Sequence, residues 1–363
     1  MRVVTFGEVM LRLCPEEFLR LTQVIPGRVE ATFGGGEVNV AVSIAQFGGD
    51  AGFLTVLPDN ALTDCFAQEL RKLNVDAGLV RRSKRGRFGV YFIETGANQR
   101  GGTVTYDRDG SSIAITPPSE YDWPKAFAGA NWFHITGITP AISEPAAGAA
   151  LAAVQGAKSH GLTVSCDLNF RKKLWRWRSG TPPVDLARET MGRLMSSVDV
   201  VIANEEDADL ALGIRAAGTD VDAGHLDVTA YGDVARTIVE RHPAVKLVAI
   251  TLRESVSASH NNWGALLYDA VANKVHLAPT GDGGKYAPYE MRNIVDRVGA
   301  GDSFAGGLIF ALNTPDLSEP ATALKFAVAA SCLKHSIKGD FNCVSRAEVE
   351  SLMKGSGAGR VQR

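Results

Sequence analysis

Short, nearly continuous apolar runs alternate with stretches of helical spacing along most of the chain. Runs such as WFHI (132–135) and VDVVIA (198–203) contain few polar residues. A strand of this kind must be covered on both faces, and a helix between two such strands allows them to run parallel. The pattern therefore predicts an α/β fold with a mostly parallel sheet and helices on both faces. Strands are expected at 3–6 and 51–57 and in runs that end near Ile135, Leu168, Ala203 and Thr251. Helices are expected at 38–47, 64–73, 144–160, 184–195, 231–241 and 321–333.

Two segments break this alternation. In 85–115 the runs FGVYFIE and TVTYDRD alternate apolar and polar residues around GANQRGG, which is typical of a β-hairpin, and no helix is expected there. Segment 13–33 also lacks helical spacing. We expect the two segments to pair into a small β-sheet that projects from the main domain as a lid. Segments 216–229 and 281–291 are expected to be loops, and 355–363 a frayed tail.

Composition argues against several classes of protein. The 363 residues include 38 Lys and Arg against 40 Asp and Glu, for a formal net charge of −2, which disfavours a nucleic-acid-binding protein. No apolar run reaches the ~18 residues of a membrane span, so no membrane partner is expected. The 5 scattered cysteines have no metal-ligand or redox spacing, which favours free thiols in a reducing cytoplasm.

A glycine turn places a carboxylate at the start of an expected helix in NIVDRVGAGDSFAGG (293–307). Gly299, Ala300 and Gly301 allow the backbone to approach a phosphate, and amides at a helix N-terminus can form an anion hole. Asp302 follows in the first turn. An anion hole beside a carboxylate fits phosphoryl transfer, in which the carboxylate accepts a proton from a substrate hydroxyl. Taken alone, these residues are equally consistent with an ordinary helix start.

The stretch DRVGAGDSFAGG (296–307) resembles the C-terminal signature of the ribokinase-like (PfkB) sugar kinases, D-x-x-G-A-G-D-x-F-x-x-G. FGGGEVNVA resembles a second signature of that family. The resemblance covers essentially the whole chain and implies one ribokinase-like domain over 1–363, a three-layer sandwich with a β-sheet lid. It also implies ATP and Mg²⁺ as cofactors, Asp302 as the catalytic base, and Gly299, Ala300 and Gly301 as the anion hole.

Within that family, the chain most resembles the 2-keto-3-deoxygluconate kinases. The supporting stretches are VVTFGEVMLRL, GGGEVNVA, WFHITGITPA, VSCDLNFRKKLW, ANEED, ITLRES and CLKHSIKGDF. The resemblance implies phosphoryl transfer from ATP to the 6-hydroxyl of this sugar acid. A kinase of a neutral sugar, of fructokinase or ribokinase type, and a catalytically silent sugar-binding regulator on the same fold remain alternatives. A dinucleotide-dependent oxidoreductase is disfavoured because G-x-G-x-x-G does not follow the first strand.

The resemblance implies that sugar contacts fall on Gly35, Tyr91, Tyr106, Arg108, Arg171 and Asp340. A sugar acid carries a carboxylate, which the planar guanidinium of arginine matches. Tyr106 and Arg108 are alternate residues of one expected strand and so share a face. Arg12 is a weaker candidate that is equally consistent with a surface position.

The nucleotide side is less distinct. ANEED resembles the family's N-x-x-E motif, which organises Mg²⁺ and phosphates through water, but its last position is Asp207. ITLRES carries Arg253 where many relatives have a glycine-rich turn, so the preference for ATP stays open. The resemblance implies nucleotide contacts at Asn204, Asp207, Thr251, Arg253 and Ser331, and indirect metal contacts through water at Glu205 and Asp207.

The expected partners are small molecules, a sugar acid and ATP. Because the edges of a projecting sheet must be covered or managed, a homo-oligomer formed through the lids is also expected.

Overall fold

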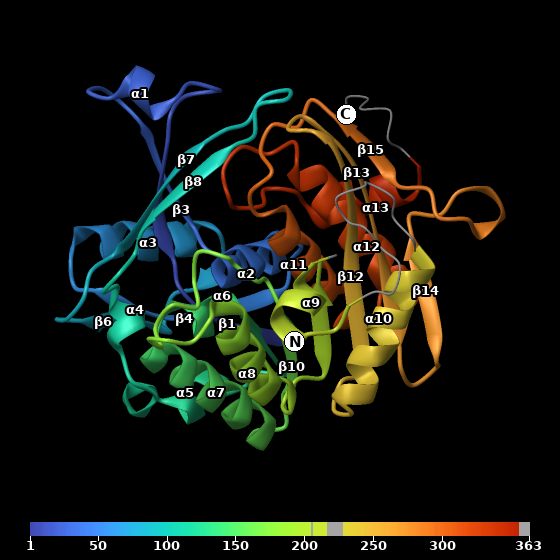
Figure 1. The fold of residues 1–363 in the computed structure, drawn as a ribbon, viewed down its shortest axis with the longest axis horizontal. Helices are drawn as coiled ribbons and strands as arrows, with labels where there is room; N and C mark the ends of the chain where they lie inside the picture. Colours follow the sequence, from blue (N-terminus) through green and yellow to red (C-terminus); the bar gives the residue numbers. More distant parts are fainter. Residues whose placement is uncertain (205, 216–227, 356–363) are drawn as a thin grey trace.

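An eleven-stranded sheet forms the middle layer of the protein in the computed structural model (Figure 1). The structure describes residues 1–204, 206–215 and 228–355. The strand order is β14-β13-β12-β11-β10-β9-β1-β4-β5, with β15 paired to β13 and β6 paired to β4. Neighbours from β12 to β5 pair in parallel, whereas β13 pairs antiparallel with β12, β14 and β15. The predicted mostly parallel sheet is therefore confirmed.

The strands of the large sheet are β1 (Arg2–Phe6), β4 (Asp50–Pro58), β5 (Val75–Asp76), β6 (Val80–Ser83), β9 (Trp132–Thr136), β10 (Thr163–Asp167), β11 (Val200–Ala203), β12 (Leu247–Ser257), β13 (His260–Asp269), β14 (Lys274–Ala278) and β15 (Tyr289–Arg292). The α-helices are α1 (Leu21–Val24), α2 (Gly36–Gln46), α3 (Ala61–Lys72), α4 (Ser112–Ile115), α5 (Trp123–Phe127), α6 (Ile138–Ile142), α7 (Glu144–Ser159), α8 (Pro183–Met195), α9 (Asp207–Leu212), α10 (Val228–Arg241), α11 (Ala300–Leu312), α12 (Pro320–Lys334) and α13 (Arg346–Met353).

Hydrophobic clusters cover both faces of the large sheet. Along β11, Val200 and Ile202 belong to the cluster that contains α2, α11 and α12. Val201 and Ala203 belong to the opposite cluster, with α7, α8 and α10. Because successive side chains of a strand point to opposite faces, such a strand is apolar at every position. The helices on both faces give the predicted three-layer sandwich (Figure 1).

The helix boundaries follow local capping signals. The Ser143 hydroxyl oxygen accepts a hydrogen bond from the Ala146 amide at 3.2 Å and begins α7. The Asn60 side chain accepts one from the Thr63 amide at 3.2 Å and begins α3. Side-chain oxygens at this position satisfy amides that the helix itself leaves unpaired. Gly48, with a φ of 91°, follows the end of α2.

A second, four-stranded sheet, which we call the small sheet, has the order β3-β2-β7-β8 and projects to the upper left in Figure 1. Its strands are β2 (Met10–Cys14), β3 (Glu30–Gly34), β7 (Gly89–Glu94) and β8 (Thr103–Asp107). The hairpin predicted in 85–115 is β7 and β8, which pair antiparallel with Tyr91 opposite Tyr106. Strand β2 links this hairpin to β3, which lies within 13–33 except for its last residue: it pairs parallel with β7 and antiparallel with β3. Because β2 begins at Met10, the small sheet starts before the predicted segment.

Several local predictions were wrong. Strand β12 does not end near Thr251 but runs to Ser257, because its outer half pairs antiparallel with β13. Strand β15 lies partly in 281–291, which the sequence predicted as a loop, and also pairs with β13. The one-turn helix α4 lies inside 85–115, where no helix was expected. The loop predicted at 216–229 was also too long, because Val228 and Thr229 belong to α10. The rest of that loop, 216–227, and residues 356–363 of the predicted tail fall outside the described residues.

Among the described residues, none of the helices combines the length and the apolar character needed to cross a bilayer. The five cysteines are free thiols, as the sequence predicted.

Candidate active site

A cavity of about 410 Å³ lies between the carboxyl ends of the parallel strands and the small sheet. Its volume is in the range that small-molecule sites occupy, and its position is the usual one for ligands of open α/β sheets. The cavity brings together fourteen of the predicted site residues: Gly35, Tyr91, Tyr106, Arg108, Arg171, Asn204, Asp207, Thr251, Arg253, Gly299, Ala300, Gly301, Asp302 and Asp340.

The predicted anion hole lies at the N-terminus of α11. Gly299 caps the helix with a φ of 79°, a left-handed conformation that glycine adopts without strain. A Cβ atom at Gly299 would also collide with the carbonyl oxygen of Asp340. Because the first amides of a helix have no partner within it, the amides that follow Gly299 are available to an anion in the cavity.

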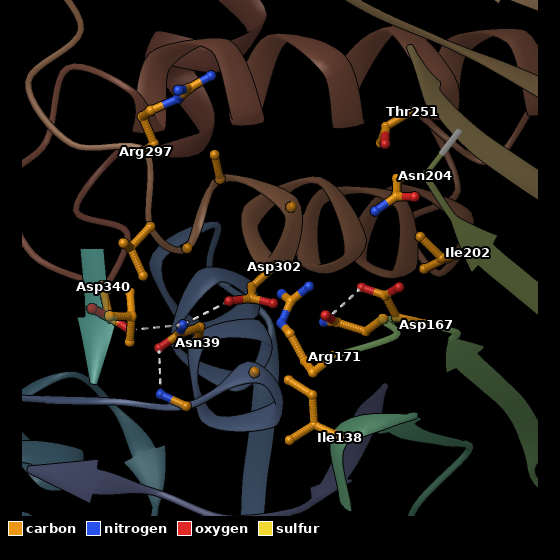
Figure 2. Close-up of a pocket in the computed structure, with 18 of the residues that line it drawn as sticks. Asn39, Ile138, Asp167, Arg171, Ile202, Asn204, Thr251, Arg297, Asp302 and Asp340 are labelled. Carbon is orange, nitrogen blue, oxygen red and sulfur yellow. Dashed lines mark hydrogen bonds between the residues drawn. The ribbon is translucent and has the colours of Figure 1, made fainter. Parts of the chain in front are cut away.

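Asp302 lies one residue beyond this turn and is half-buried on the cavity wall. Its Oδ2 accepts a hydrogen bond from Asn39 Nδ2 at 2.6 Å (Figure 2). Burial raises the pKa of Asp302 to about 6, although the bond from Asn39 opposes the rise. At neutral pH the group is therefore mainly ionised, yet more basic than an ordinary carboxylate, which suits a general base.

Asp340 is anchored by side chains from three segments. Its Oδ1 accepts hydrogen bonds from Arg12 Nη1 at 2.7 Å and from the Tyr91 hydroxyl at 2.6 Å. Its Oδ2 lies 3.4 Å from Asn39 Nδ2. Arg12 is only 2% exposed, so the surface position that its sequence also allowed is excluded. Its charge is compensated by Asp340 and by Asp296, 2.6 Å from Nη2, so we expect it not to bind a substrate carboxylate.

Arg108 is buried and paired with Glu8, the second residue after β1. Its guanidinium also lies over the ring of Tyr106, 5.4 Å from the ring centre. The Nε of Arg108 and the Oε1 of Glu8 are buried without a hydrogen-bond partner in the described part of the chain. The positive charge of Arg108 is therefore already neutralised before any substrate enters.

Arg171 differs from Arg108 in both exposure and pairing. It follows β10, is exposed, and makes no ion pair with any described residue. Its Nη1 donates a long hydrogen bond, 3.4 Å, to the carbonyl of Phe170. In Figure 2 its guanidinium extends toward Asp302. Its charge lowers the pKa values of Asp302 and of Asp167, against the burial that raises both.

On the opposite side of the cavity, the ANEED segment forms a local turn. Asn204 Oδ1 accepts hydrogen bonds from the amides of Glu206 and Asp207 at 2.9 and 3.0 Å. Asp207 accepts one from the Phe170 amide at 3.0 Å and one from the Asn204 amide at 3.2 Å. Burial raises the pKa of Asp207. Both of its oxygens thus hold backbone in place, which the sequence did not indicate. Glu205 lies outside the described residues.

Of the five predicted nucleotide contacts, Ser331 alone does not line the cavity. Ser331 is completely buried, and its hydroxyl donates a hydrogen bond to the Ala300 carbonyl at 2.7 Å. The structure therefore gives Ser331 a role in fixing the start of α11 against α12.

The model of the pfkB family carbohydrate kinases matches residues 1–346. This chain belongs to that family. The structure of 2-dehydro-3-deoxygluconokinase from Thermotoga maritima is 41% identical, has a TM-score of 0.87, and spans 98% of this chain and 100% of that one. The 2-dehydro-3-deoxygalactonokinase of Haloferax volcanii is 31% identical over 98% of each chain.

A more distant structure has the same fold. A ribokinase II from E. coli, described as putative and solved in complex with ATP and Mg²⁺, has a TM-score of 0.75 at 19% identity, over 98% of this chain and 99% of that one. At this identity the similarity concerns the fold alone.

Several cavity residues of this PfkB kinase escaped the sequence analysis. Glu8 lies two residues after the end of β1 and could have been noticed on that ground. Asn39 lies in the quoted FGGGEVNVA signature, but nothing local indicates that it contacts Asp302 and Asp340. Arg297 stands inside the DRVGAGD motif and bonds Asn261 Oδ1 at 2.9 Å. Asp167, the last residue of β10, also lines the cavity.

The described residues contain no group of three or more His, Cys, Asp or Glu side chains that could hold a metal ion. Mg²⁺ commonly keeps several waters and takes much of its coordination from substrate phosphates, with only one or two protein carboxylates. The acidic residues of this PfkB cavity are compatible with that mode of binding and not with a cage made of protein side chains.

Proposed function

We propose that this protein is an ATP-dependent kinase that phosphorylates the 6-hydroxyl of 2-keto-3-deoxygluconate. The observation that carries the proposal is the position of Asp302 beside the amides that follow Gly299, in a cavity that also contains Arg171, which forms no ion pair with a described residue. A base, an anion hole and a carboxylate-binding cation are the groups that this reaction requires.

In the proposed reaction, ionised Asp302 accepts the proton of the 6-hydroxyl group of the substrate. The oxygen of that hydroxyl group attacks the γ-phosphorus of ATP. The bond from that phosphorus to the β–γ bridging oxygen breaks, and ADP leaves. The amides of Ala300 and Gly301, with that of Gly299, stabilise the charge on the phosphoryl oxygens. The pKa of Asp302, about 6, supports its role because the group is ionised at neutral pH and still basic.

Arg171 is the best candidate to bind the substrate carboxylate. It has the one property that Arg12 and Arg108 lack, a positive charge that no described carboxylate neutralises through an ion pair. Arg108 with Glu8, Tyr91 and Tyr106 would then contact the keto and hydroxyl groups, and Gly35 would allow the sugar close to the start of α2.

The residues of the nucleotide side fit a triphosphate. Arg253 and Thr251 would bind phosphates, and Asn204 and Asp207 would hold the wall of the site. Mg²⁺, when bound, would neutralise part of the phosphate charge. The small sheet would act as a lid that excludes water. Its edge strands β3 and β8 would be the surface for a homo-oligomer.

One observation favours the alternative of a neutral-sugar kinase. Because Glu8 neutralises Arg108, the pair presents no net charge to the sugar. If Arg171 served the nucleotide phosphates instead, the sugar side of the cavity would suit a neutral sugar.

The test is ADP release from Mg-ATP with 2-keto-3-deoxygluconate, 2-keto-3-deoxygalactonate, fructose, ribose and adenosine as acceptors. Asp302→Asn serves as the blank for ATP hydrolysis. Activity confined to the keto acids is the expected result. Activity confined to fructose, ribose or adenosine would overturn the substrate assignment and leave the role of Asp302 intact.

A further inference from the structure

Arg12 joins the small sheet to the two loops that build the anion hole. It lies on β2, and its side chain reaches into the main domain. Nη1 donates to Asp340 at 2.7 Å and Nη2 to Asp296 at 2.6 Å. All three residues are at most 5% exposed. One guanidinium thus bridges two buried carboxylates from segments far apart in the chain.

We propose that Arg12 is a positioning residue for phosphoryl transfer, which holds the anion-hole loop and the base Asp302 in register with the small sheet. The proposal rests on the proposed function in its use of Asp302 as the base. It assigns Arg12 no contact with substrate.

The first line of support runs through Asp296. Its Oδ1 accepts a hydrogen bond from the Val298 amide and its Oδ2 one from the Gly339 amide, both at 3.0 Å. Val298 directly precedes Gly299, so Asp296 fixes the loop that enters the anion hole. The Nη2 atom of Arg12 shares the same Oδ2 and therefore orients this carboxylate.

The second line runs through Asp340. Arg12 and Tyr91, from neighbouring strands of the small sheet, both donate to Asp340 Oδ1. Asn39 Nδ2 contacts Asp340 Oδ2 at 3.4 Å and Asp302 Oδ2 at 2.6 Å. The backbone of Asp340 packs against Gly299. A displacement of Asp340 would therefore reach both the base and the anion hole.

The charges around Asp340 also affect the pKa of Asp302. Asp340 raises the pKa of Asp302, whereas Arg171 and Lys334 lower it. The Lys334 ammonium is completely buried and donates to the carbonyls of Val298, Ile337 and Gly339 at 2.8–3.2 Å. These three bonds hold it in place, so it cannot replace Arg12 as the partner of Asp340. Without Arg12, Asp340 would lose the cation nearest to it, and its negative charge would act on Asp302 undiminished.

The experiment compares Arg12→Gln, Arg12→Lys and a control, Arg20→Gln, in the full chain. Arg20 is also an arginine of the small-sheet segment paired with a carboxylate, Glu94, but it is 45% exposed and outside the cavity. The variants are measured with the acceptor on which the wild-type protein is most active, so that a different sugar specificity does not affect the result. The readouts are kcat, KM, the pH profile of kcat/KM and thermal unfolding.

For Arg12→Gln we expect kcat to fall about a hundredfold with a smaller change in KM, since misplacement of catalytic groups acts mainly on turnover. The acid limb of kcat/KM should move up by about one pH unit. Arg12→Lys should keep the acid limb near its wild-type position but recover only part of kcat, because an ammonium cannot bridge both carboxylates. Arg20→Gln should match the wild type.

A double variant tests the route through Asp340. In Arg12→Gln/Asp340→Asn the acid limb should return toward the wild-type position, whatever the value of kcat. An acid limb that stays in place in Arg12→Gln, with a loss only in thermal stability, would show that Arg12 is merely structural. A shifted limb that persists in the double variant would contradict the route through Asp340. If Arg12→Gln does not fold, the test uses Arg12→Lys instead. An acid limb of kcat/KM and a kcat that both equal the wild-type values in Arg12→Lys would then overturn the proposal.

Discussion

The two sides of the cavity are built by different means. On the side proposed to bind the sugar, here called the sugar side, side chains from distant segments bind one another. Arg12 binds Asp340 across 328 positions of the sequence, and Tyr91 binds Asp340 across 249. On the side proposed to bind the nucleotide, here called the nucleotide side, the side chains of Asn204 and Asp207 bind backbone amides, some of them three positions away in the sequence. The sugar side is thus an assembly of compensated charges, whereas the nucleotide side is a set of turns that keeps backbone in place.

This difference predicts where a substitution should act. A charge removed on the sugar side leaves its partner uncompensated beside the reacting groups, so it should change catalysis and specificity. A side chain removed on the nucleotide side releases a turn, so it should change stability more than chemistry. Four experiments test this contrast.

The largest effect is expected where the two sides meet, at Asp302. Asp302→Asn should reduce kcat ~10³-fold or more, because the amide cannot accept the hydroxyl proton. The hydrogen bond from Asn39 can be kept by the new carbonyl oxygen, so the thermal unfolding temperature should stay close to the wild-type value. Asp282→Asn, at an exposed aspartate, is the matched control. Turnover near the wild-type level in Asp302→Asn would remove Asp302 from its proposed role.

Asp302 was also the part of the site that the sequence predicted best, and the reason is physical. The turn, the proposed anion hole and the proposed base lie within four consecutive residues, so their geometry is set by local backbone conformation. The alternating pattern of β7 and β8 is equally local, and the hairpin was predicted correctly.

The features that the sequence did not predict depend on contacts between distant segments. Nothing near Arg12 indicates that Asp296 and Asp340 converge on it, so its sequence allowed a surface position. Strand β15 is short and largely polar, and it is a strand only because β13 lies beside it. The buried position of Ser331 likewise results from the packing of α12 against α11.

The next largest effect separates the two arginines of the sugar side. Arg171→Gln should raise KM for 2-keto-3-deoxygluconate roughly a hundredfold, because the cation proposed to bind the substrate carboxylate is lost. Residual activity with fructose should change less. Lys172→Gln, at the neighbouring exposed cation, is the control. Equal losses with the acidic and the neutral sugar would mean that Arg171 serves the phosphates and would favour the neutral-sugar alternative.

The pH dependence of kcat/KM should reflect the same base. Because burial raises the pKa of Asp302 to about 6, activity should be nearly constant above that pH and fall about tenfold per pH unit below it, as the carboxylate becomes protonated. His335 also lines the cavity, but burial lowers its pKa to about 4, so it stays neutral through this range. An acid limb of kcat/KM near pH 4, which is close to the ordinary pKa of an aspartate, would contradict the buried environment inferred for Asp302.

The smallest catalytic effect is expected for Asp207, and it tests the nucleotide side directly. Asp207→Asn replaces one of two acceptor oxygens with a donor that faces a backbone amide, of Phe170 or of Asn204. We expect a loss of about 1–3 kcal/mol in the free energy of unfolding, the usual cost of breaking a hydrogen bond to a buried charged group. KM for ATP and the Mg²⁺ concentration for half-maximal activity should stay near the wild-type values. Glu206→Gln, at the exposed neighbour, is the control. A large rise in the Mg²⁺ requirement without loss of stability would instead give Asp207 the water-mediated metal contact that its motif implies, and the contrast between the two sides would no longer hold.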